Sequence, residues 1–198
     1  MSVAYRSERY SLMNTPIETE RHVRRVMRHL SPNRQDRILE VGCGRGFLAR
    51  RIQQHSPGTQ GIDVNPNSIR HAVTRNLAVM SALRLGFRDA AFDKIYSFHT
   101  IEHLSDVGLA LSEMARVLRP DGRLLLVYPA EPIRGLFAVP AAVRMFRNPR
   151  KAREMHLHKL TPRRLRALIE NRGLALEHVE SVFSLLLTPQ FVTVLQRH

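Results

Sequence analysis

Three alternating glycines, Gly42, Gly44 and Gly46, follow a short apolar strand and precede an amphipathic helix. Because glycine has no Cβ and tolerates positive φ, such a turn lets a ligand approach the backbone closely. The helix that begins near Phe47 directs its unpaired N–H groups at whatever lies over the turn. Asp63 closes a second strand about 20 residues later, where a carboxylate can bind both hydroxyls of a ribose. This spacing predicts a nucleotide-type binding site.

The glycine spacing separates the possible ligands of this turn. The pattern Gly-x-Gly-x-Gly differs from the Gly-x-Gly-x-x-Gly of dinucleotide folds, and no Gly-Lys-Ser/Thr sequence follows, as a P-loop would require. Cys43 lies between two of the glycines, and we expect it to be a small filler and not a nucleophile. As the only cysteine it cannot form an internal disulfide, which fits a reducing cytoplasm. No signal peptide is apparent at the N-terminus, so we expect a cytoplasmic location.

The elements that must position these residues alternate between strand and helix. Apolar runs bounded by turn residues predict strands, and the continuously apolar run 124–127 predicts a central buried strand. Such alternation indicates one α/β domain whose parallel sheet is covered by helices on both faces. Strands are expected at 38–41, 59–64, 77–80, 92–98, 123–128, 175–183 and 191–196, and helices at 16–30, 47–55, from 66, 106–118 and 161–171.

Two helix starts carry a cap followed by proline. Thr15 is the expected N-cap of the first helix, Pro16 occupies its first position, and Glu18 completes a capping box. Thr161 and Pro162 repeat the cap and the proline later in the chain. Both helices should therefore begin at these residues.

Five blocks in order resemble the class I S-adenosylmethionine-dependent methyltransferases. The resemblance covers about residues 36–128 and is close to the ubiquinone/menaquinone-biosynthesis-like (type 11) subgroup. It implies a Rossmann-like sheet of seven mostly parallel strands, with helices on both faces and the last strand antiparallel. The blocks are Glu40 to Gly46, Asp63, Phe92 to Ile95, Ile101 to Leu104, and Arg116 to Leu124.

The resemblance also divides the chain into parts of a single domain. Residues 1–35 would form an N-terminal helical cap, and residues 36–128 the core that binds S-adenosyl-L-methionine. Residues 130–160 would be an inserted substrate lid, and residues 161–198 a C-terminal helix with two strands. Because ligands of this fold bind beyond the carboxyl ends of the strands, we expect the insertion to cover that edge.

The resemblance assigns binding roles to particular positions. The glycine turn would approach the methionine part of the cofactor, Asp63 would take the ribose hydroxyls, and Val64 would lie against adenine. Residues 97–99 would line the methionine side. The implied cofactor-binding residues are Glu40, Gly42, Cys43, Gly44, Gly46, Asp63, Val64, Ser81, Ala82, Ser97 and Phe98.

One position departs from the pattern of the relatives. They carry Asp-Ala where this chain has Ser81 and Ala82, and proline where it has Gly86. A serine hydroxyl is shorter and uncharged, so a contact with the adenine amino group would be lost or bridged by water, at about 0.5–1.5 kcal/mol. The alternative, which we favour, is drift that the rest of the site tolerates.

Methyl transfer from a sulfonium mainly needs proximity and orientation, because the donor is already activated. A base is needed only when the nucleophile starts protonated. The candidates are His103 and His99, followed by Tyr10, His156 and His158. A structural role for His103 is the stronger alternative. His156 and His158 are not expected to bind metal, because we expect no cysteine or carboxylate ligand near them.

The acceptor should be decided by residues 130–160, where an apolar stretch (133–146) is interleaved with arginines. The segment either packs on the domain or, as an amphipathic helix, contacts an anionic membrane surface. The net charge of +14 is nearly all arginine and indicates either an anionic partner or a coding bias. We therefore expect a small-molecule or lipid-like acceptor such as a quinone, polyketide or lipid. The alternatives are RNA, although few aromatic residues could stack bases, a protein acceptor, or a non-catalytic binding subunit.

Overall fold

The computed structural model describes residues 18–184 and 188–198. The strands are β1 (Ile38–Val41), β2 (Gln60–Asp63), β3 (Leu77–Val79), β4 (Phe92–Phe98), β5 (Leu118–Pro129), β6 (Leu174–Phe183) and β7 (Pro189–Arg197). The α-helices are α2 (Thr19–Leu30), α3 (Phe47–Ile52), α4 (Pro66–Arg70), α5 (Val107–Val117), α6 (Val139–Phe146), α7 (Ala152–Met155) and α8 (Pro162–Ile169). Three short 3-10 helices are η3 (Ile101–His103), η4 (Leu136–Ala138) and η5 (Pro149–Lys151).

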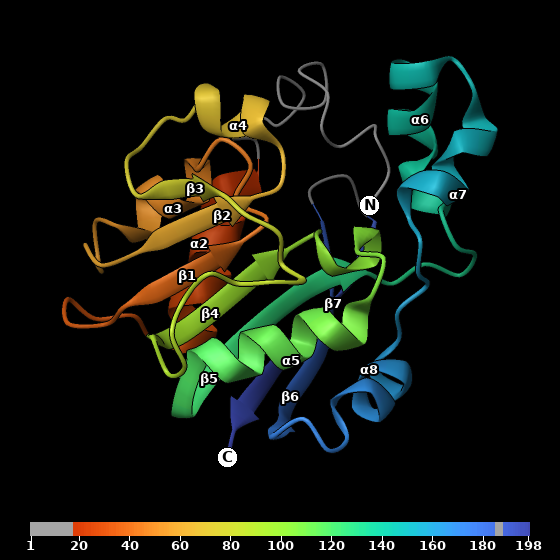
Figure 1. Cartoon of the computed structure of the whole chain (residues 1–198). Coiled ribbons are helices and arrows are strands. Elements are labelled where there is room, and N and C mark those ends of the chain that lie inside the picture. The colour runs from red at the N-terminus through yellow and green to blue at the C-terminus, as the bar shows by residue number, and fades with distance from the viewer. Residues whose placement is uncertain (1–17, 185–187) are drawn as a thin grey trace.

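All seven strands form one sheet in the order β3-β2-β1-β4-β5-β7-β6 (Figure 1). The first five pair in parallel, whereas β7 lies between β5 and β6 and is antiparallel to both. The predicted seven-stranded, mostly parallel sheet with an antiparallel last strand is confirmed. The carboxyl ends of β1, β2, β3 and β4 meet at one edge of the sheet, so the residues that follow these strands lie close together.

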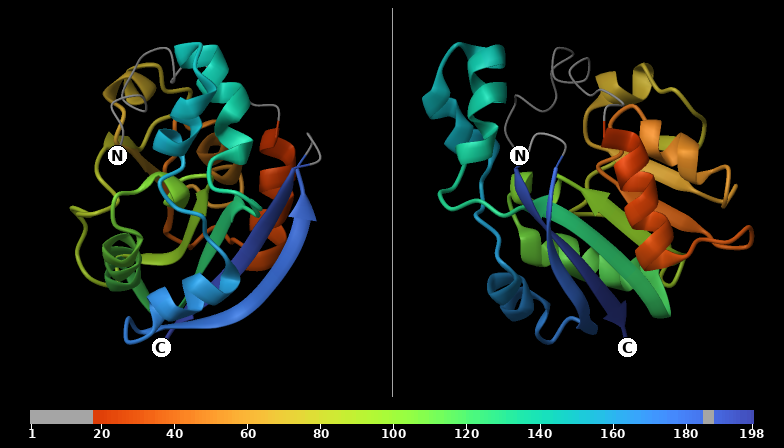
Figure 2. Two further views of the ribbon diagram at one scale, coloured as in Figure 1. Left: turned by 90° about the vertical axis from the view of Figure 1, so that its right-hand side faces the viewer. Right: turned by 180° about the vertical axis from the view of Figure 1, so that it is seen from behind.

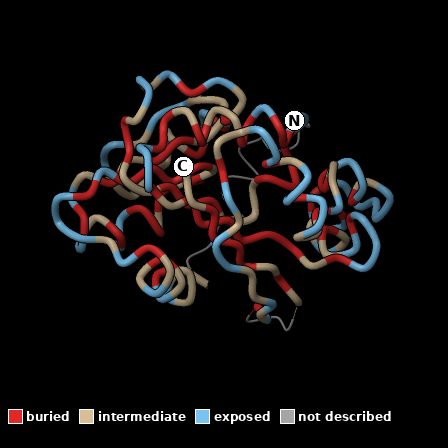
Figure 3. Tube along the Cα trace, turned by 90° about the horizontal axis from the view of Figure 1, so that it is seen from below, coloured by how far each residue is buried: buried red, intermediate tan, exposed pale blue. Residues whose placement is uncertain are grey.

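Helices cover both faces of the sheet, as Figure 2 shows with α2 on the side opposite to α5. Helices α2 and α3 bury Val26, Leu30 and Ile52 against one face, and α5 and α8 bury Leu111 and Leu165 against the other. Strands β4 and β5 lie between the two layers, and Figure 3 shows buried chain running through the middle of the molecule. The predicted two-sided packing of the sheet follows from this burial.

Several element boundaries differ from the predictions. The first α-helix among the described residues, α2, begins at Thr19. Thr15 and Pro16, and with them the predicted capping box, lie outside the described residues. The predicted cap at the later helix is confirmed, since the Thr161 hydroxyl accepts from the N–H of Arg164 at 3.2 Å. That helix ends at Ile169, two residues early, because the following backbone leaves the helical region.

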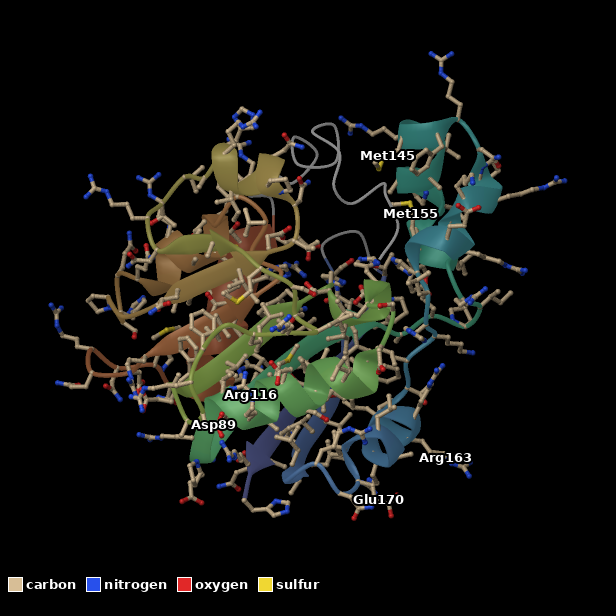
Figure 4. The ribbon with its side chains drawn as sticks, in the orientation of Figure 1. Asp89, Arg116, Met145, Met155, Arg163 and Glu170 are labelled. Carbon is tan, nitrogen blue, oxygen red and sulfur yellow. The ribbon has the colours of Figure 1, made fainter. Side chains whose placement is uncertain are left out.

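The loop from 81 to 89, which borders the cavity described below, is held by Arg116 of α5. Its guanidinium donates to the carbonyls of Leu85 and Phe87 at 2.8 and 2.9 Å, and to the carboxylates of Glu113 and Asp89. Figure 4 shows Arg116 directed from the helix toward Asp89. This helix therefore positions a loop that has no regular structure of its own.

Residues 130–160 form a separate helical segment around α6 and α7, which Figures 1 and 2 show standing apart from the sheet. Its small core contains Ala138, Ala142, Met145, Ala152 and Met155, and Figure 4 places both methionines on these helices. Within the described parts of the chain, no helix is both long enough and apolar enough to cross a bilayer.

Candidate cofactor and active site

A cavity of about 420 Å³ opens at the carboxyl edge of the sheet. Its size lies within the usual range of small-molecule sites. Its walls come from the residues after β1, β2, β3 and β4, from η3, and from the first turn of α2. The lining residues are Glu18, Thr19, His22, Glu40 to Cys43, Phe47, Leu48, Ile62 to Val64, Met80 to Leu83, Phe98 to Thr100, and His103 to Ser105.

No residue of the 130–160 segment lines this cavity, since every lining residue lies between 18 and 105. The role of this segment as a lid over the acceptor stays a prediction. The segment contacts residues of η3 and the residue after it, among them the lining residues His103 and Leu104. The N–H of Leu157 donates to the carbonyl of Glu102 at 2.9 Å, and its helices build their own core instead of folding over the opening.

The glycine turn has the backbone that its sequence predicts. Gly42, Gly44 and Gly46 have φ of 80°, 53° and 82°, which L residues rarely adopt. The N–H groups of Gly42 and Cys43 both donate to the carbonyl of Ile62, at 2.8 and 2.9 Å, and so join the turn to β2. Gly44 and Gly46 do not line the cavity themselves; they shape the turn.

Gly42→Ala is expected to destabilise the protein by about 2–4 kcal/mol, because the new Cβ meets steric clash and a disfavoured φ. That Cβ would lie 2.0 Å from Oγ1 of Thr100. Gly86→Ala is the matched control, since its Cβ would lie 3.4 Å from the nearest atom, at Met80, without a positive φ. Urea unfolding of both variants provides the measurement, and equal midpoints would show that Gly42 has no such role.

Asp63 is held in place by two backbone N–H groups. One carboxylate oxygen accepts from Gly44 at 2.8 Å and the other from Asn65 at 2.8 Å. Burial raises the pKa of Asp63, against the effect of these hydrogen bonds. Each carboxylate oxygen has a second acceptor position. The side chain can therefore accept from a pair of ligand hydroxyls while it stays fixed to the turn.

Glu40 lies in the wall of the cavity and is buried. The hydroxyl of Tyr96 donates to its carboxylate at 3.2 Å. Burial raises the pKa of Glu40 to about 8, and the hydrogen bond from Tyr96 only partly opposes this. In the ligand-free cavity Glu40 is therefore protonated near neutral pH, and it would ionise more readily beside a cationic ligand.

The opposite end of the cavity is apolar. Val64, Met80, Ala82 and Leu83 line it together with Ser81. The Ser81 hydroxyl oxygen accepts from the N–H of Leu83 at 3.2 Å and so fixes the start of the loop. Ser81 belongs to the cavity wall, at the position where the resemblance implies an aspartate. Whether it contacts adenine remains a prediction.

Two residues expected on the methionine side take different positions. Phe98 lines the cavity and its ring lies 4.3 Å from that of His22. Ser97 is not among the lining residues; it is buried, and its hydroxyl donates to the carbonyl of Val41 at 2.9 Å. Strand alternation explains the correction, because successive side chains of β4 point to opposite faces of the sheet.

Cys43 also lines the cavity. The thiol is buried, and burial raises its pKa, so little nucleophilic thiolate forms near neutral pH. This position fits the predicted filler.

Both histidines predicted as bases, His99 and His103, line the cavity. His99 has a left-handed backbone with φ of 50°, and its Nε2 lies 2.9 Å from the side-chain amide nitrogen of Gln190. Burial lowers the pKa of His103, whose Nδ1 donates to the carbonyl of Met155 at 2.9 Å. This hydrogen bond fixes the His103 ring at the cavity wall, and the choice between a catalytic and a structural role stays a prediction.

The remaining base candidates lie elsewhere. His156 and His158 do not line the cavity; His156 packs behind His103 with ring centroids 5.0 Å apart. His158 Nε2 lies 2.9 Å from the carbonyl of Leu104. Tyr10 falls outside the described residues.

Glu102 was not predicted as a site residue, although it belongs to one of the quoted blocks. It is buried beneath His99 and His103. Burial alone would raise its pKa, but the imidazoles of His103 and His99 bring the pKa down to about 2. Glu102 is therefore ionised at neutral pH.

Several residues that line the cavity were not predicted, among them His22, Thr100 and Leu104. Burial lowers the pKa of His22, which lies on α2 one helical turn before the buried Val26. That periodicity could have placed it on the inner face. Thr100 follows β4, and only the folded chain brings its side chain against Gly42.

A parallel sheet with a glycine turn after β1, a carboxylate after β2 and a common cavity defines a Rossmann-like protein of the nucleotide-binding class. The sequence model of the family described as "Methyltransferase domain" matches residues 15–179. The chain belongs to this family, and the resemblance drawn from its motifs is confirmed.

Individual relatives give the same result. An O-methyltransferase, rstn1, of Aspergillus nomiae is 36% identical over 121 residues, which cover 56% of this chain and 54% of that protein. A demethylmenaquinone methyltransferase of Thermus thermophilus is 34% identical over 113 residues, covering 52% of this chain and 51% of that one. The chain spans about half the length of the curated relatives it matches.

A solved structure supports the fold. A 1,6-didemethyltoxoflavin-N1-methyltransferase of Burkholderia thailandensis, with its substrate and S-adenosylhomocysteine bound, aligns with a TM-score of 0.71. The alignment covers 98% of this chain and 84% of that one at 15% identity. At this identity the likeness concerns the fold alone.

Proposed function

We propose that this protein transfers the methyl group of S-adenosyl-L-methionine to a small-molecule acceptor. The observation that carries the proposal is one cavity shared by the glycine turn, Asp63 and Glu40. Family membership supports the reaction type, and the named O-methyltransferase and menaquinone relatives support acceptors of the small-molecule class.

The residues present fit the parts of this cofactor. Asp63 is fixed by two N–H groups and keeps acceptor positions for the ribose hydroxyls. Val64, Met80 and Leu83 form an apolar wall for adenine. Glu40 supplies a carboxylate for the cationic methionine end, beside the turn whose Gly42 and Cys43 line the cavity.

When bound, the cofactor supplies an activated methyl group on a sulfonium. This chain has to orient the two reactants in line and keep water out. His99 and His103 lie in the wall beside the glycine turn, where they could hold an acceptor group or take its proton. A protonated acceptor would need that help, whereas an acceptor with a free lone pair would not.

The direct test is turnover with isotopically labelled methyl donor. We expect transfer of label to hydroxyl-bearing quinone, phenol or lipid acceptors, with release of S-adenosylhomocysteine. The Asp63→Asn variant should transfer far less at the same donor concentration. Failure of the wild-type protein to bind the donor at high micromolar concentration would contradict the proposal, and label appearing only in RNA or protein would redirect it.

Lipid-like acceptors are supported by the surface of the 130–160 segment. Ile133, Leu136, Val143 and Phe146 are between 39% and 59% exposed, and Arg144 lies among them in sequence. Apolar side chains beside arginines are typical of helices that lie on anionic lipid. We propose that this face contacts an anionic membrane surface.

Sedimentation with vesicles tests the membrane contact. Binding to phosphatidylglycerol-containing vesicles should exceed binding to neutral ones, and the Val143→Ser/Phe146→Ser double variant should lose most of it. The control is Val79→Ser, a 52% exposed residue on β3. Equal binding of the double variant and the control would contradict the contact.

A further inference from the structure

Glu102, His103 and His156 converge behind the cavity. All three are buried, and one potential ligand atom from each lies within 4.8 Å of the others. Glu102 and His103 belong to η3, which follows β4, whereas His156 follows α7. The cluster therefore forms only when the 130–160 segment docks against η3.

Hydrogen bonds to backbone groups fix both halves of the cluster. The N–H of Leu157 donates to the carbonyl of Glu102 at 2.9 Å, and Nδ1 of His103 donates to the carbonyl of Met155 at 2.9 Å. His156 lies in sequence between these two anchored residues, Met155 and Leu157. Its position beside His103 is thus set by the docking itself and not by a long, flexible side chain.

The hydrogen bonds also set the tautomers of both rings. A backbone carbonyl can only accept, so His103 carries its proton on Nδ1. His156 places Nδ1 2.9 Å from the carboxylate of Glu131, which in turn accepts from two backbone N–H groups. In each neutral ring the lone pair is then on Nε2. Histidines that bind metals are commonly oriented in this way by an acceptor on their other nitrogen.

Glu102 provides an independent observation. Both of its carboxylate oxygens are buried and have no hydrogen-bond partner among the described residues. The nearest ring nitrogens, Nδ1 of His99 and Nε2 of His103, lie 3.6 and 3.8 Å away, beyond hydrogen-bond distance. A carboxylate whose buried oxygens accept no hydrogen bond is costly to bury, and a bound cation would satisfy them.

We propose that Glu102, His103 and His156 bind a divalent transition-metal cation of the Zn²⁺ type. Two imidazoles with one carboxylate suit Zn²⁺, Co²⁺ or Fe²⁺ better than Mg²⁺, which prefers oxygen ligands. Tetrahedral coordination at about 2.1 Å sets the ligand atoms about 3.4 Å apart, so the side chains close in by about 1 Å on binding. Three protein ligands leave a fourth position for water or substrate.

The position of the cation suggests its role, and this part rests on the proposed function. His103 belongs to both the cluster and the cavity wall, so the fourth position is expected at that wall. A hydroxyl bound there loses its proton to solvent more readily. Its oxygen then forms the bond to the methyl carbon as the S–CH₃ bond breaks, which releases S-adenosylhomocysteine. The structure thus favours hydroxyl-bearing acceptors.

Metal binding is tested without turnover, so its failure would be distinct from failure of the methyl transfer. Protein freed of metal by chelator dialysis is titrated with Zn²⁺ by calorimetry and with Co²⁺ by visible absorption. The wild-type protein is expected to bind one ion per chain and to show d–d absorption. Glu102→Gln and His156→Asn should each lose more than about 100-fold in affinity.

His55→Gln is the control for adventitious surface sites, because His55 is exposed in the turn after α3. It should bind as the wild type does. Thermal unfolding without metal checks that both ligand variants fold. Zn²⁺ should raise the unfolding midpoint of the wild type and of the control, and should leave the midpoints of the two ligand variants unchanged. The proposal is overturned if the wild type shows no tight site, or if tight binding survives in the two ligand variants.

Discussion

The Asp63→Asn variant is expected to bind S-adenosylhomocysteine about 10- to 100-fold more weakly than the wild type. A hydrogen bond to a charged group contributes about 1.5–3 kcal/mol, and the amide provides one uncharged acceptor in place of two charged oxygens. Calorimetric titration gives the affinity. The backbone N–H groups of Gly44 and Asn65 hold the carboxylate in place. The variant therefore loses ligand affinity through a changed geometry of residue 63 as well as through the lost charge.

Asp89→Asn is the control for this variant, because Asp89 lies on the outer loop with its side chain 75% exposed. It removes the same charge without touching the cavity, so its affinity should equal that of the wild type. Since Asp63 also holds the turn, thermal unfolding of the variant is needed beside the titration. A folded Asp63→Asn protein with wild-type affinity would mean that the ribose is not bound here.

Cofactor affinity is expected to rise with pH up to about 8 and then to level off. The pKa of Glu40 in the ligand-free protein is about 8, because burial opposes its ionisation. A cationic ligand favours the ionised form, so binding below that pH must first release the proton. The gain approaches about tenfold per pH unit below the pKa of Glu40. In the Glu40→Gln variant, affinity should be lower and its dependence on pH weaker.

The stability of the ligand-free protein should show the opposite trend. The pKa of Glu40 is raised from 4.5 to about 8 on folding, so the folded state holds a proton that the unfolded state has lost. The contribution of Glu40 to the free energy of unfolding is fully present below pH 4.5. It is lost as pH rises through about 8, at about 1.4 kcal/mol per pH unit. Glu40→Gln removes this loss.

Urea unfolding of wild type and variant across this window measures the effect. The difference between the two curves isolates Glu40 from other groups, including Asp63, whose pKa is also raised by burial. The free energy of unfolding of the variant should exceed that of the wild type increasingly toward pH 8. Parallel curves would contradict the assigned burial of this charge.

The donor side of the site could be predicted from sequence because its determinants are local. The spacing of Gly42, Gly44 and Gly46 predicts a turn, and Asp63 ends a strand that the sequence predicts. In parallel sheets the ends of such strands meet at one edge, so topology supplies the rest. The position of Ser97 shows the limit of this reasoning, since a one-residue choice along a strand decides which face a side chain takes.

The acceptor side could not be predicted in the same way. Residues 130–160 have an amphipathic composition, yet nothing in it specifies that the helices stand beside the cavity instead of over it. The cluster that we propose as a metal site could not be predicted for a related reason. In sequence the carboxylate nearest to His156 is that of Glu154, whereas in the fold His156 lies beside Glu102 and Glu131, which are distant along the chain. Long-range docking, and not local pattern, assembles this cluster.

The central claim is that the cavity at the carboxyl edge of the sheet binds the S-adenosyl group, and a crystal structure with S-adenosylhomocysteine tests it most directly. The ribose hydroxyls should lie on the carboxylate of Asp63, adenine beside Val64, and the amino-acid end over the glycine turn near Glu40. A ligand bound elsewhere, or one in this cavity that leaves Asp63 without a ribose contact, would contradict the claim.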